Sequence, residues 1–184
     1  VLDCCAAPGG KSFAAGIQGA KEIISCDIHP HKIGLIEAGA QRLGISDLTA
    51  RVQNAAEFFP EWEERMDVVL CDVPCSGYGI IRKKPDIRYK DPAQTAELPQ
   101  LQGKILHNAS RYVKPGGVLI YGTCTLVREE NEGVVETFLQ DHPDFYLEKL
   151  PLPGIFPENT TGMLALIPGQ HDTDGFFIAK LRRN

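Results

Sequence analysis

Features of membrane proteins and of disulfide-rich secreted proteins are missing from the sequence. No stretch of about 18 apolar residues occurs, so we expect no segment that spans a membrane. No signal peptide is recognisable. The six cysteines follow no regular spacing, which favours reduced thiols. The sequence therefore predicts a cytoplasmic protein without membrane association.

Metal-binding patterns and an excess of basic charge are also missing. No C-x-x-C occurs, adjacent Cys4 and Cys5 rarely ligate one ion together, and the pair Cys71 and Cys75 has no partner pair, so we expect no metal. The net charge of the 184 residues is −5, whereas a dedicated nucleic-acid module is basic overall. A nucleic-acid substrate would need a local basic patch or segments outside this chain.

The opening stretch Val1–Ser12 joins a short apolar strand to a Pro-Gly-Gly turn and a following helix. Such a loop lets a nucleotide-like ligand approach the backbone and the free N–H groups of the helix. The dinucleotide fingerprint G-x-G-x-x-G is absent. Gly10-Lys11-Ser12 looks like the end of a P-loop, but the missing first glycine, which would fall at Cys5, argues against one. The loop alone predicts only a cofactor site.

Strands and helices alternate along the chain, which predicts a single α/β domain with a parallel sheet. The strand at 66–71 is apolar and is predicted to be buried on both faces. A long loop over 78–92 and a Pro- and Gly-rich stretch after 150 interrupt the alternation. The predicted strands are 1–3, 22–26, 48–52, 66–71, 118–122, 145–150 and 176–181, and the predicted helices are 11–17, 30–43, 98–112 and 129–139.

Polar and nucleophilic side chains gather at the carboxyl ends of these strands, where ligands bind in such sheets. Asp27 follows the second strand, and this position favours binding of two vicinal ribose hydroxyls over the alternatives of a helix N-cap or a surface acid. Asn54 follows the third strand and could bind an adenine edge or simply form a turn. The full set at the strand ends is Asp3, Asp27, Asn54, Asp72, Cys75 and Cys124.

Two thiols follow two strands that would be neighbours in the sheet, Cys75 in Pro74-Cys-Ser-Gly77 and Cys124 after Gly122-Thr. They could form a redox pair, a metal pair or two parts of covalent catalysis, and the nearby Asp72 favours the last. Either cysteine alone would usually be a small buried apolar residue. We interpret the other four cysteines, Cys4, Cys5, Cys26 and Cys71, as small buried apolar residues of this kind.

The motifs Asp3–Lys11, Asp72–Gly77 and Gly122–Cys124 together resemble those of RNA cytosine-5 methyltransferases that use S-adenosylmethionine. The stretches 80–88 and Asp174–Ala179 look like the bacterial RsmB type, which modifies 16S ribosomal RNA. The resemblance covers nearly the whole chain. It implies a class I methyltransferase fold, with a mostly parallel seven-stranded sheet whose last strand is antiparallel. It also implies that 1–184 is the catalytic domain of a longer protein whose N-terminal RNA-binding regions are not included.

The resemblance further implies roles for individual residues. Cys124 would attack C6 of cytosine, Cys75 would help to release the product, Asp72 would bind the ring, and Lys11 would orient Asp72 or lower the thiol pKa. Three residues depart from the family pattern: Asn54 stands where Asp is usual, Val73 where Ala is usual, and Thr125 where Ser is usual. The residues expected to contact the cofactor are Cys5, Ala6, Ala7, Pro8, Gly9, Gly10, Lys11, Asp27, Asn54 and Asp72.

The partner implied by the resemblance is RNA, and specifically small-subunit ribosomal RNA, and we expect a monomer. The basic residues Arg82, Lys83, Lys84 and Arg88, with Tyr78 and Tyr89, could hold an unstacked strand; otherwise they form a solvated loop. Three alternatives stay open: the same chemistry on transfer RNA or another ribosomal cytosine, a P-loop-like nucleotide hydrolase, and a non-catalytic RNA-binding module.

Overall fold

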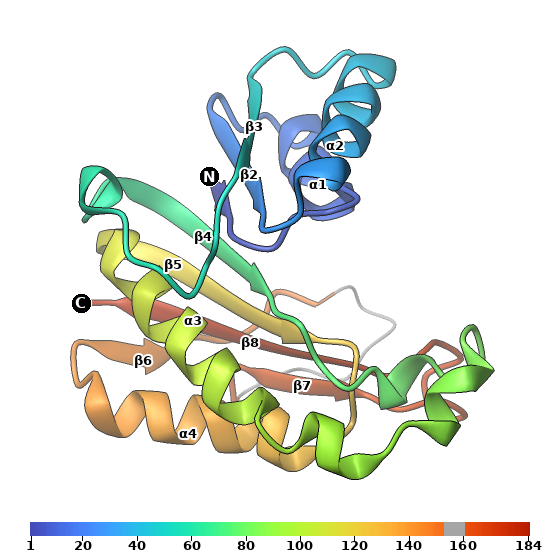
Figure 1. Cartoon of the computed structure of the whole chain (residues 1–184). Coiled ribbons are helices and arrows are strands. Elements are labelled where there is room, and N and C mark those ends of the chain that lie inside the picture. Colours follow the sequence, from blue (N-terminus) through green and yellow to red (C-terminus); the bar gives the residue numbers. More distant parts are fainter. Residues whose placement is uncertain (153–160) are drawn as a thin grey trace.

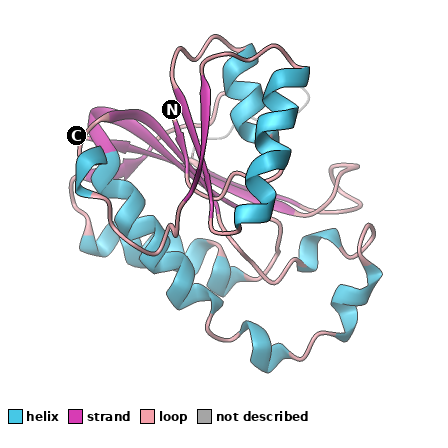
Figure 2. Ribbon diagram, turned by 45° about the horizontal axis from the view of Figure 1, so that its top comes forward, coloured by secondary structure: helices cyan, strands magenta, loops and turns pink. Residues whose placement is uncertain are grey.

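A sheet with helices on both faces forms the framework of the molecule (Figures 1 and 2). The computed structural model describes residues 1–152 and 161–184, and within them the sheet has eight strands. Their order is β3-β2-β1-β4-β5-β8-β6, and β7 pairs with β8 beside this path. The strands are β1 Leu2–Asp3, β2 Ile23–Asp27, β3 Leu48–Val52, β4 Met66–Asp72, β5 Val113–Thr123, β6 Phe145–Leu147, β7 Met163–Leu166 and β8 Phe176–Arg183.

The strand directions confirm the predicted class I fold, but the described part of the sheet has eight strands rather than the predicted seven, because β7 also pairs with β8. Strands β1 to β5 pair with one another in parallel, whereas β8 is antiparallel to β5. Both β6 and β7 pair antiparallel with β8, β7 along its first half and β6 along its second. The parallel pairing places the carboxyl ends of the first five strands at one edge of the sheet.

Four α-helices flank the sheet within the described residues: α1 Gly10–Ile17, α2 Pro30–Arg42, α3 Leu98–Tyr112 and α4 Glu132–Asp141. Helices α1 and α2 lie on one face of the sheet, beside β1 to β3. Helices α3 and α4 lie on the other face, where α3 contacts β4, β5 and α4 (Figures 1 and 2). The buried side of α3 presents Ile105, Ala109 and Tyr112, as their helical spacing predicts. All four helices lie where the sequence predicts them.

The prediction that β4 is buried on both faces is wrong. Met66, Val69 and Cys71 are buried, but Asp67 is exposed and Leu70 is only half-buried. The reason is that α3 covers one face, whereas the other face borders an apolar cavity of about 410 Å³ beside α1. From Val68 to Asp72, burial therefore alternates with the period of two that is typical of a sheet with one covered face.

Three further boundaries differ from the prediction. The turn at 114–117 lies inside β5 as a bulge, because Val113 pairs with Met66 and Val118 with Val68. Three short 3-10 turns, Tyr78–Ile80, Pro85–Tyr89 and Pro92–Thr95, occupy the predicted long loop. The Pro- and Gly-rich stretch contains β7, and its residues 153–160 lie outside the described part of the chain.

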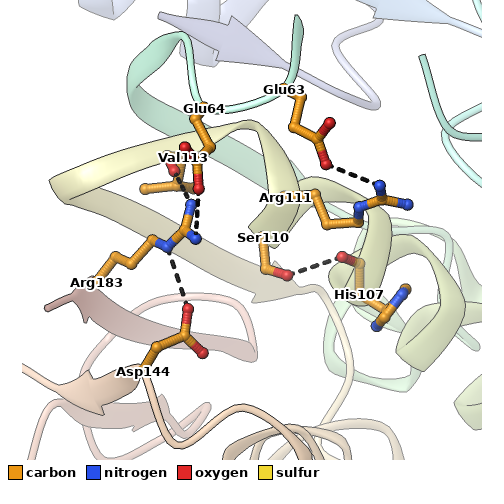
Figure 3. A network of polar contacts seen from close by, with 8 residues as sticks. All are labelled: Glu63, Glu64, His107, Ser110, Arg111, Val113, Asp144 and Arg183. Carbon is orange, nitrogen blue, oxygen red and sulfur yellow. Dashed lines mark hydrogen bonds and ion pairs between the residues drawn. The ribbon is translucent and has the colours of Figure 1, made fainter. Parts of the chain in front are cut away.

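Two kinds of contact hold the sheet together. Apolar side chains with no exposed surface, including Leu119, Phe177 and Leu181, form the core. At the rim, the Arg183 guanidinium donates to the carboxylates of Asp144 and Glu64 and to the carbonyl of Val113 (Figure 3). This network joins β8 to β5, to the turn before β4 and to the turn before β6. It lies at the edge of the sheet opposite the carboxyl ends of β1 to β5.

No helix within residues 1–152 and 161–184 combines the length and the apolar character needed to cross a bilayer.

Candidate active site

The loop between β1 and α1 is held in a conformation that only glycine allows at one point. Gly9 has a φ of 111°, and a Cβ there would lie 2.3 Å from Cζ of Phe13. The loop is also bonded to β2, because the amide of Ala6 donates to the carbonyl of Cys26 at 2.7 Å. Helix α1 therefore begins directly behind the turn, with its free N–H groups toward the strand ends.

A series of buried side-chain hydrogen bonds links this loop and the start of α1 to β1 and β2. The Ser25 hydroxyl donates to Ser12 Oγ, which in turn donates to Asp3 Oδ2, both at 2.7 Å. Asp3 is 1% exposed, and its other oxygen, Oδ1, has no hydrogen-bond partner among the described residues. Burial raises the pKa of Asp3 to about 6. The sequence places Asp3 at a strand end but does not predict this contact chain.

Two adjoining cavities open at the strand ends. A cavity of about 340 Å³ is lined by Cys5, Ala7, Asp27, Asn54 and Asp72 among others. A smaller one, of about 220 Å³, is lined by Asp3, Cys5, Ala6, Ala7, Pro8, Gly10, Lys11 and Asp72. Every residue expected to contact the cofactor lines one of these cavities except Gly9, which shapes the turn. The lining also includes Ile28, His29 and Lys32, which the sequence reasoning missed although they directly follow Asp27.

Asp27 and Asn54 each combine a local role with a place in the larger cavity. Asp27 is buried, and its Oδ1 accepts the amide of His29 at 3.0 Å and lies 3.7 Å from Lys32 Nζ. Asn54 Oδ1 accepts the amide of Ala56, and its Nδ2 donates to Glu57, both at 3.0 Å. The turn role considered for Asn54 is therefore present, and the side-chain oxygen keeps one lone pair for a ligand.

Asp72 and Lys11 form an ion pair between the two sides of the smaller cavity. Lys11 Nζ lies 2.5 Å from Asp72 Oδ2. Lys11 comes from the first turn of α1 and Asp72 from the end of β4, so the contact exists only because β1 and β4 are neighbours. The ammonium also lies 5.3 Å from the centre of the Phe176 ring.

The two predicted thiols meet beside this ion pair. Cys75 Sγ lies 3.1 Å from Cys124 Sγ, and the amide of Cys124 donates to Cys75 Sγ at 3.3 Å. The hydrogen bond from the Cys75 thiol lowers the pKa of Cys124 to about 7, whereas the same contact raises the pKa of Cys75. Cys124 is therefore the thiol that ionises near neutral pH, and the thiolate is the nucleophilic form.

A buried polar network, not foreseen from the sequence, holds the loops of both cysteines. Glu130 Oε2 accepts from the amide of Ser76 and from Gln102 Nε2, both at 2.9 Å. Gln102 also donates to the carbonyl of Pro74, and Ser76 Oγ lies 2.7 Å from Thr125 Oγ1. Gln102 lies on the face of α3 where the spacing of apolar residues predicts the core. A polar residue at such a position was the signal in the sequence that could have indicated this network.

The four basic residues expected to bind RNA divide into two pairs. Lys83 and Arg82 face Asp174, with nitrogen–oxygen distances of 2.5 and 3.6 Å. All four side chains are exposed, including those of Arg82 at 71% and Lys83 at 69%, and Tyr89 has 82% of its surface accessible. Lys90, from the same loop, donates to the carbonyl of Ser76 at 2.9 Å and so ties the loop to Cys75.

The other four cysteines differ in how deeply they are buried. Cys4, Cys26 and Cys71 are buried, as predicted, and burial raises the pKa of Cys26. Cys5 is half-buried and lines both cavities, so its description as a buried apolar residue is incomplete. The described residues contain no group of three or more His, Cys, Asp or Glu side chains that could hold a metal ion.

Asp3→Asn should stabilise the fold at neutral pH. The folded pKa of about 6 lies above the ordinary value of 3.8, so ionised Asp3 lowers the free energy of unfolding above pH 6. The variant should unfold with a free energy about 1–3 kcal/mol higher at pH 7, and the gain should fade as pH drops from 6 to 4. Urea unfolding across this range measures the gain, with Asp47→Asn at an exposed position as the control. A less stable Asn variant at pH 7 would show that the Asp3 charge is stabilising.

Cys124 should react with iodoacetamide with a midpoint near pH 7, because its pKa is lowered to about 7. The Cys75→Ala variant removes the donor, so the midpoint should rise toward the ordinary thiol value of about 8.5. Mass spectrometry of the alkylated peptides gives the rate at each pH. Cys5, whose pKa is raised by burial, is the internal control and should react more slowly. An unchanged midpoint in Cys75→Ala would contradict the role of the thiol–thiol contact.

Solved structures of similar chains share this architecture. NSun6 from Pyrococcus horikoshii, solved with SFG, has a TM-score of 0.82 and 28% identity, covering 99% of this chain and 47% of that one. A methyltransferase homologue from the same organism has a TM-score of 0.77 and 29% identity, covering 100% and 61%.

Sequence comparisons identify the family. The family model described as 16S rRNA methyltransferase RsmB/F matches residues 1–182. Probable ribosomal RNA small subunit methyltransferase B of Bacillus subtilis is 42% identical over all of this chain and 43% of that protein. Ribosomal RNA small subunit methyltransferase F of Escherichia coli is 35% identical over all of this chain and 40% of that protein. This chain thus spans less than half the length of these relatives, and it belongs to the RsmB/F family of 16S rRNA methyltransferases.

Proposed function

We propose that the chain transfers a methyl group from S-adenosylmethionine to carbon 5 of a cytosine in RNA, with 16S ribosomal RNA as the substrate. Membership of the family supports methylation of ribosomal RNA by this cofactor. The choice of cytosine C5 rests on one observation, the pair of thiols 3.1 Å apart beside the Lys11–Asp72 ion pair. Methylation of a nitrogen or an oxygen would need no such pair.

The lining of the two cavities fits the proposed cofactor. The Asp27 carboxylate uses only Oδ1 within the described residues, so its second oxygen is available for ribose hydroxyls. Asn54 would receive an adenine amino group on its side-chain oxygen. In the smaller cavity, the unpartnered Oδ1 of Asp3 suits the ammonium group of the methionine end, since a buried carboxylate oxygen without a donor is costly.

Cys124 is the proposed nucleophile. When bound, S-adenosylmethionine supplies an electrophilic methyl group, but C5 of an unmodified cytosine is too weakly nucleophilic to accept it. The Cys124 thiolate would add to C6 and turn C5 into the nucleophilic carbon of an enamine. With a thiol pKa of about 7, a substantial fraction of Cys124 is ionised at neutral pH.

Asp72 and Cys75 would assist the two halves of the reaction. The Asp72 carboxylate, held by Lys11, would accept a hydrogen bond from the cytosine amino group, or in its protonated form donate one to N3, and so favour addition at C6. In the second half, the C5 proton leaves and the bond between C6 and sulfur breaks, returning the electron pair to Cys124. The Cys75 thiol, 3.1 Å away, would donate to that departing thiolate and so promote release.

The target base must reach this site outside its stack, so the substrate is a loop or a flipped nucleotide. The exposed Lys84, Arg88 and Tyr89 would contact the strand beside the base. With a net charge of −5, the chain has no general attraction for phosphates, so this local patch would supply the contacts made by the chain itself.

Asp27→Ala should weaken binding of S-adenosylmethionine by about 1–3 kcal/mol, the range for a lost hydrogen bond to a charged group. Isothermal calorimetry on the folded variant measures the change. Asp47→Ala removes an exposed carboxylate at the other end of β3 and should bind as the unaltered protein does. Equal affinity for Asp27→Ala and Asp47→Ala would remove Asp27 from the proposed site.

The two cysteines should fail in different ways. Cys124→Ala should abolish both methylation and any protein–RNA adduct, because no thiolate remains to attack C6. Cys75→Ala should still attack but release slowly, so that a covalent complex accumulates. Denaturing gels of the full-length protein with RNA and cofactor separate these outcomes. A trapped complex with Cys124→Ala and none with Cys75→Ala would reverse the assignment, and full activity in both would exclude covalent catalysis by these residues.

A further inference from the structure

The segment Asp174-Gly175-Phe176, at the entry to β8, has no role in the chemistry above, yet it contacts three separate parts of the proposed site. We propose that it is the positioning element of the active site, which fixes the loop of Cys124, the Lys11–Asp72 pair and the basic loop relative to one another. This inference builds on the proposed function. The segment touches none of the reacting atoms and would act only through the groups it holds.

Gly175 fixes the loop of Cys124 through Gly79. The amide of Gly79 donates to the carbonyl of Cys124 at 3.0 Å, and the amide of Gly175 donates to the carbonyl of Gly79 at 2.8 Å. The two backbones approach so closely that a Cβ on Gly175 would lie 2.6 Å from Cα of Gly79. A Cβ on Gly79 would lie 2.4 Å from the carbonyl oxygen of Gly175 and 2.8 Å from that of Cys124. Neither glycine has a positive φ, so space is what requires glycine at both positions.

Phe176 fixes the second part, the ion pair. The centre of its ring lies 5.3 Å from Lys11 Nζ, within the range of a cation–π contact, while the same nitrogen lies 2.5 Å from Asp72. The ring also packs against β5, since a Cβ on Gly122 would lie 3.1 Å from its Cζ. Phe176 therefore limits the directions open to the Lys11 side chain, which is half-exposed at 46%.

Asp174 fixes the third part, the basic loop. Its carboxylate lies 2.5 Å from Lys83 and 3.6 Å from Arg82, and its own side chain is only 16% exposed. The hydrogen bond from Lys83 holds the pKa of Asp174 below its usual range. The green segment that contains these basic residues and the red segment leading into β8 lie together beyond the strand ends (Figure 1). These ion pairs hold Lys83 and Arg82 near Asp174, whereas Lys84 and Arg88 are exposed.

These three contacts explain why one short segment would matter to residues far away in the sequence. Strand β8 pairs with β5 from Thr123 to Val118, so its first residues lie next to the loop that begins with Cys124. A displacement of about 1 Å in a reacting group can lower a rate on the order of a hundredfold. The segment thus has the position and the contacts to set the reaction geometry.

The test uses the full-length protein and three variants. Gly175→Ala should lower kcat on the order of a hundredfold while changing KM for RNA little, and it should raise the alkylation midpoint of Cys124. Phe176→Leu should lower kcat about fivefold with the fold retained. Asp174→Asn should chiefly raise KM for RNA. The controls are Gly103→Ala, where a Cβ meets open space, and Phe58→Leu, which removes a ring that faces Arg111 away from the site.

The outcomes separate this proposal from the proposed function. If Gly175→Ala matches Gly103→Ala in both kcat and alkylation midpoint, the junction does not position Cys124 and the proposal fails. If Gly175→Ala does not fold, Phe176→Leu and Asp174→Asn decide, and values equal to the Phe58→Leu control would overturn it. If the unaltered protein forms no 5-methylcytosine, the proposed function fails, while the alkylation midpoint of Gly175→Ala still tests the positioning of Cys124.

Discussion

The parallel pairing of β4 with β5 is the constraint on which the site depends. Asp72 lies opposite Gly122 in this pairing, so the loops that follow the two strands start side by side. Parallel strands must end at the same edge of a sheet, and this brings Cys75 and Cys124 together although 49 positions separate them. A slip of the register would separate the thiols and remove the hydrogen bond that lowers the pKa of Cys124.

Polar groups buried below the strand ends make this arrangement rigid. Glu130 accepts two hydrogen bonds at 2.9 Å, and its backbone carbonyl accepts from the hydroxyl of Tyr121, whose own side chain is in the core. Buried polar groups are stable only when their partners are in place, so the network specifies one conformation of the cysteine loops. Three buried side-chain oxygens of the described residues lack a hydrogen-bond partner, namely Oε1 of Gln102 in this network, Oδ1 of Asp174 and Oδ1 of Asp3. Asp3 lines the smaller cavity, where a ligand would compensate for the missing partner.

Local sequence signals predicted most elements, and the misses have a common cause. The helices and the strand ends follow from apolar spacing and from Pro and Gly positions, which act within a few residues. The uncovered face of β4, the bulge in β5 and the strand β7 depend on which element packs on which, and no local pattern reports that. Likewise, Lys83 and Arg82 looked like free basic residues, because their partner Asp174 lies far along the chain.

Local patterns are sufficient to predict the class of fold and the set of residues at the strand ends, because alternating strands and helices bring those ends to one edge, and three motifs are sufficient to indicate the family. The 3.1 Å contact that makes Cys124 the more acidic thiol and the role of Asn54 in a turn follow only from the packed structure. It also revealed the crossing of Gly79 with Gly175. Each of these depends on distances between segments remote in the chain, and such distances are set only when the sheet and the helices pack together.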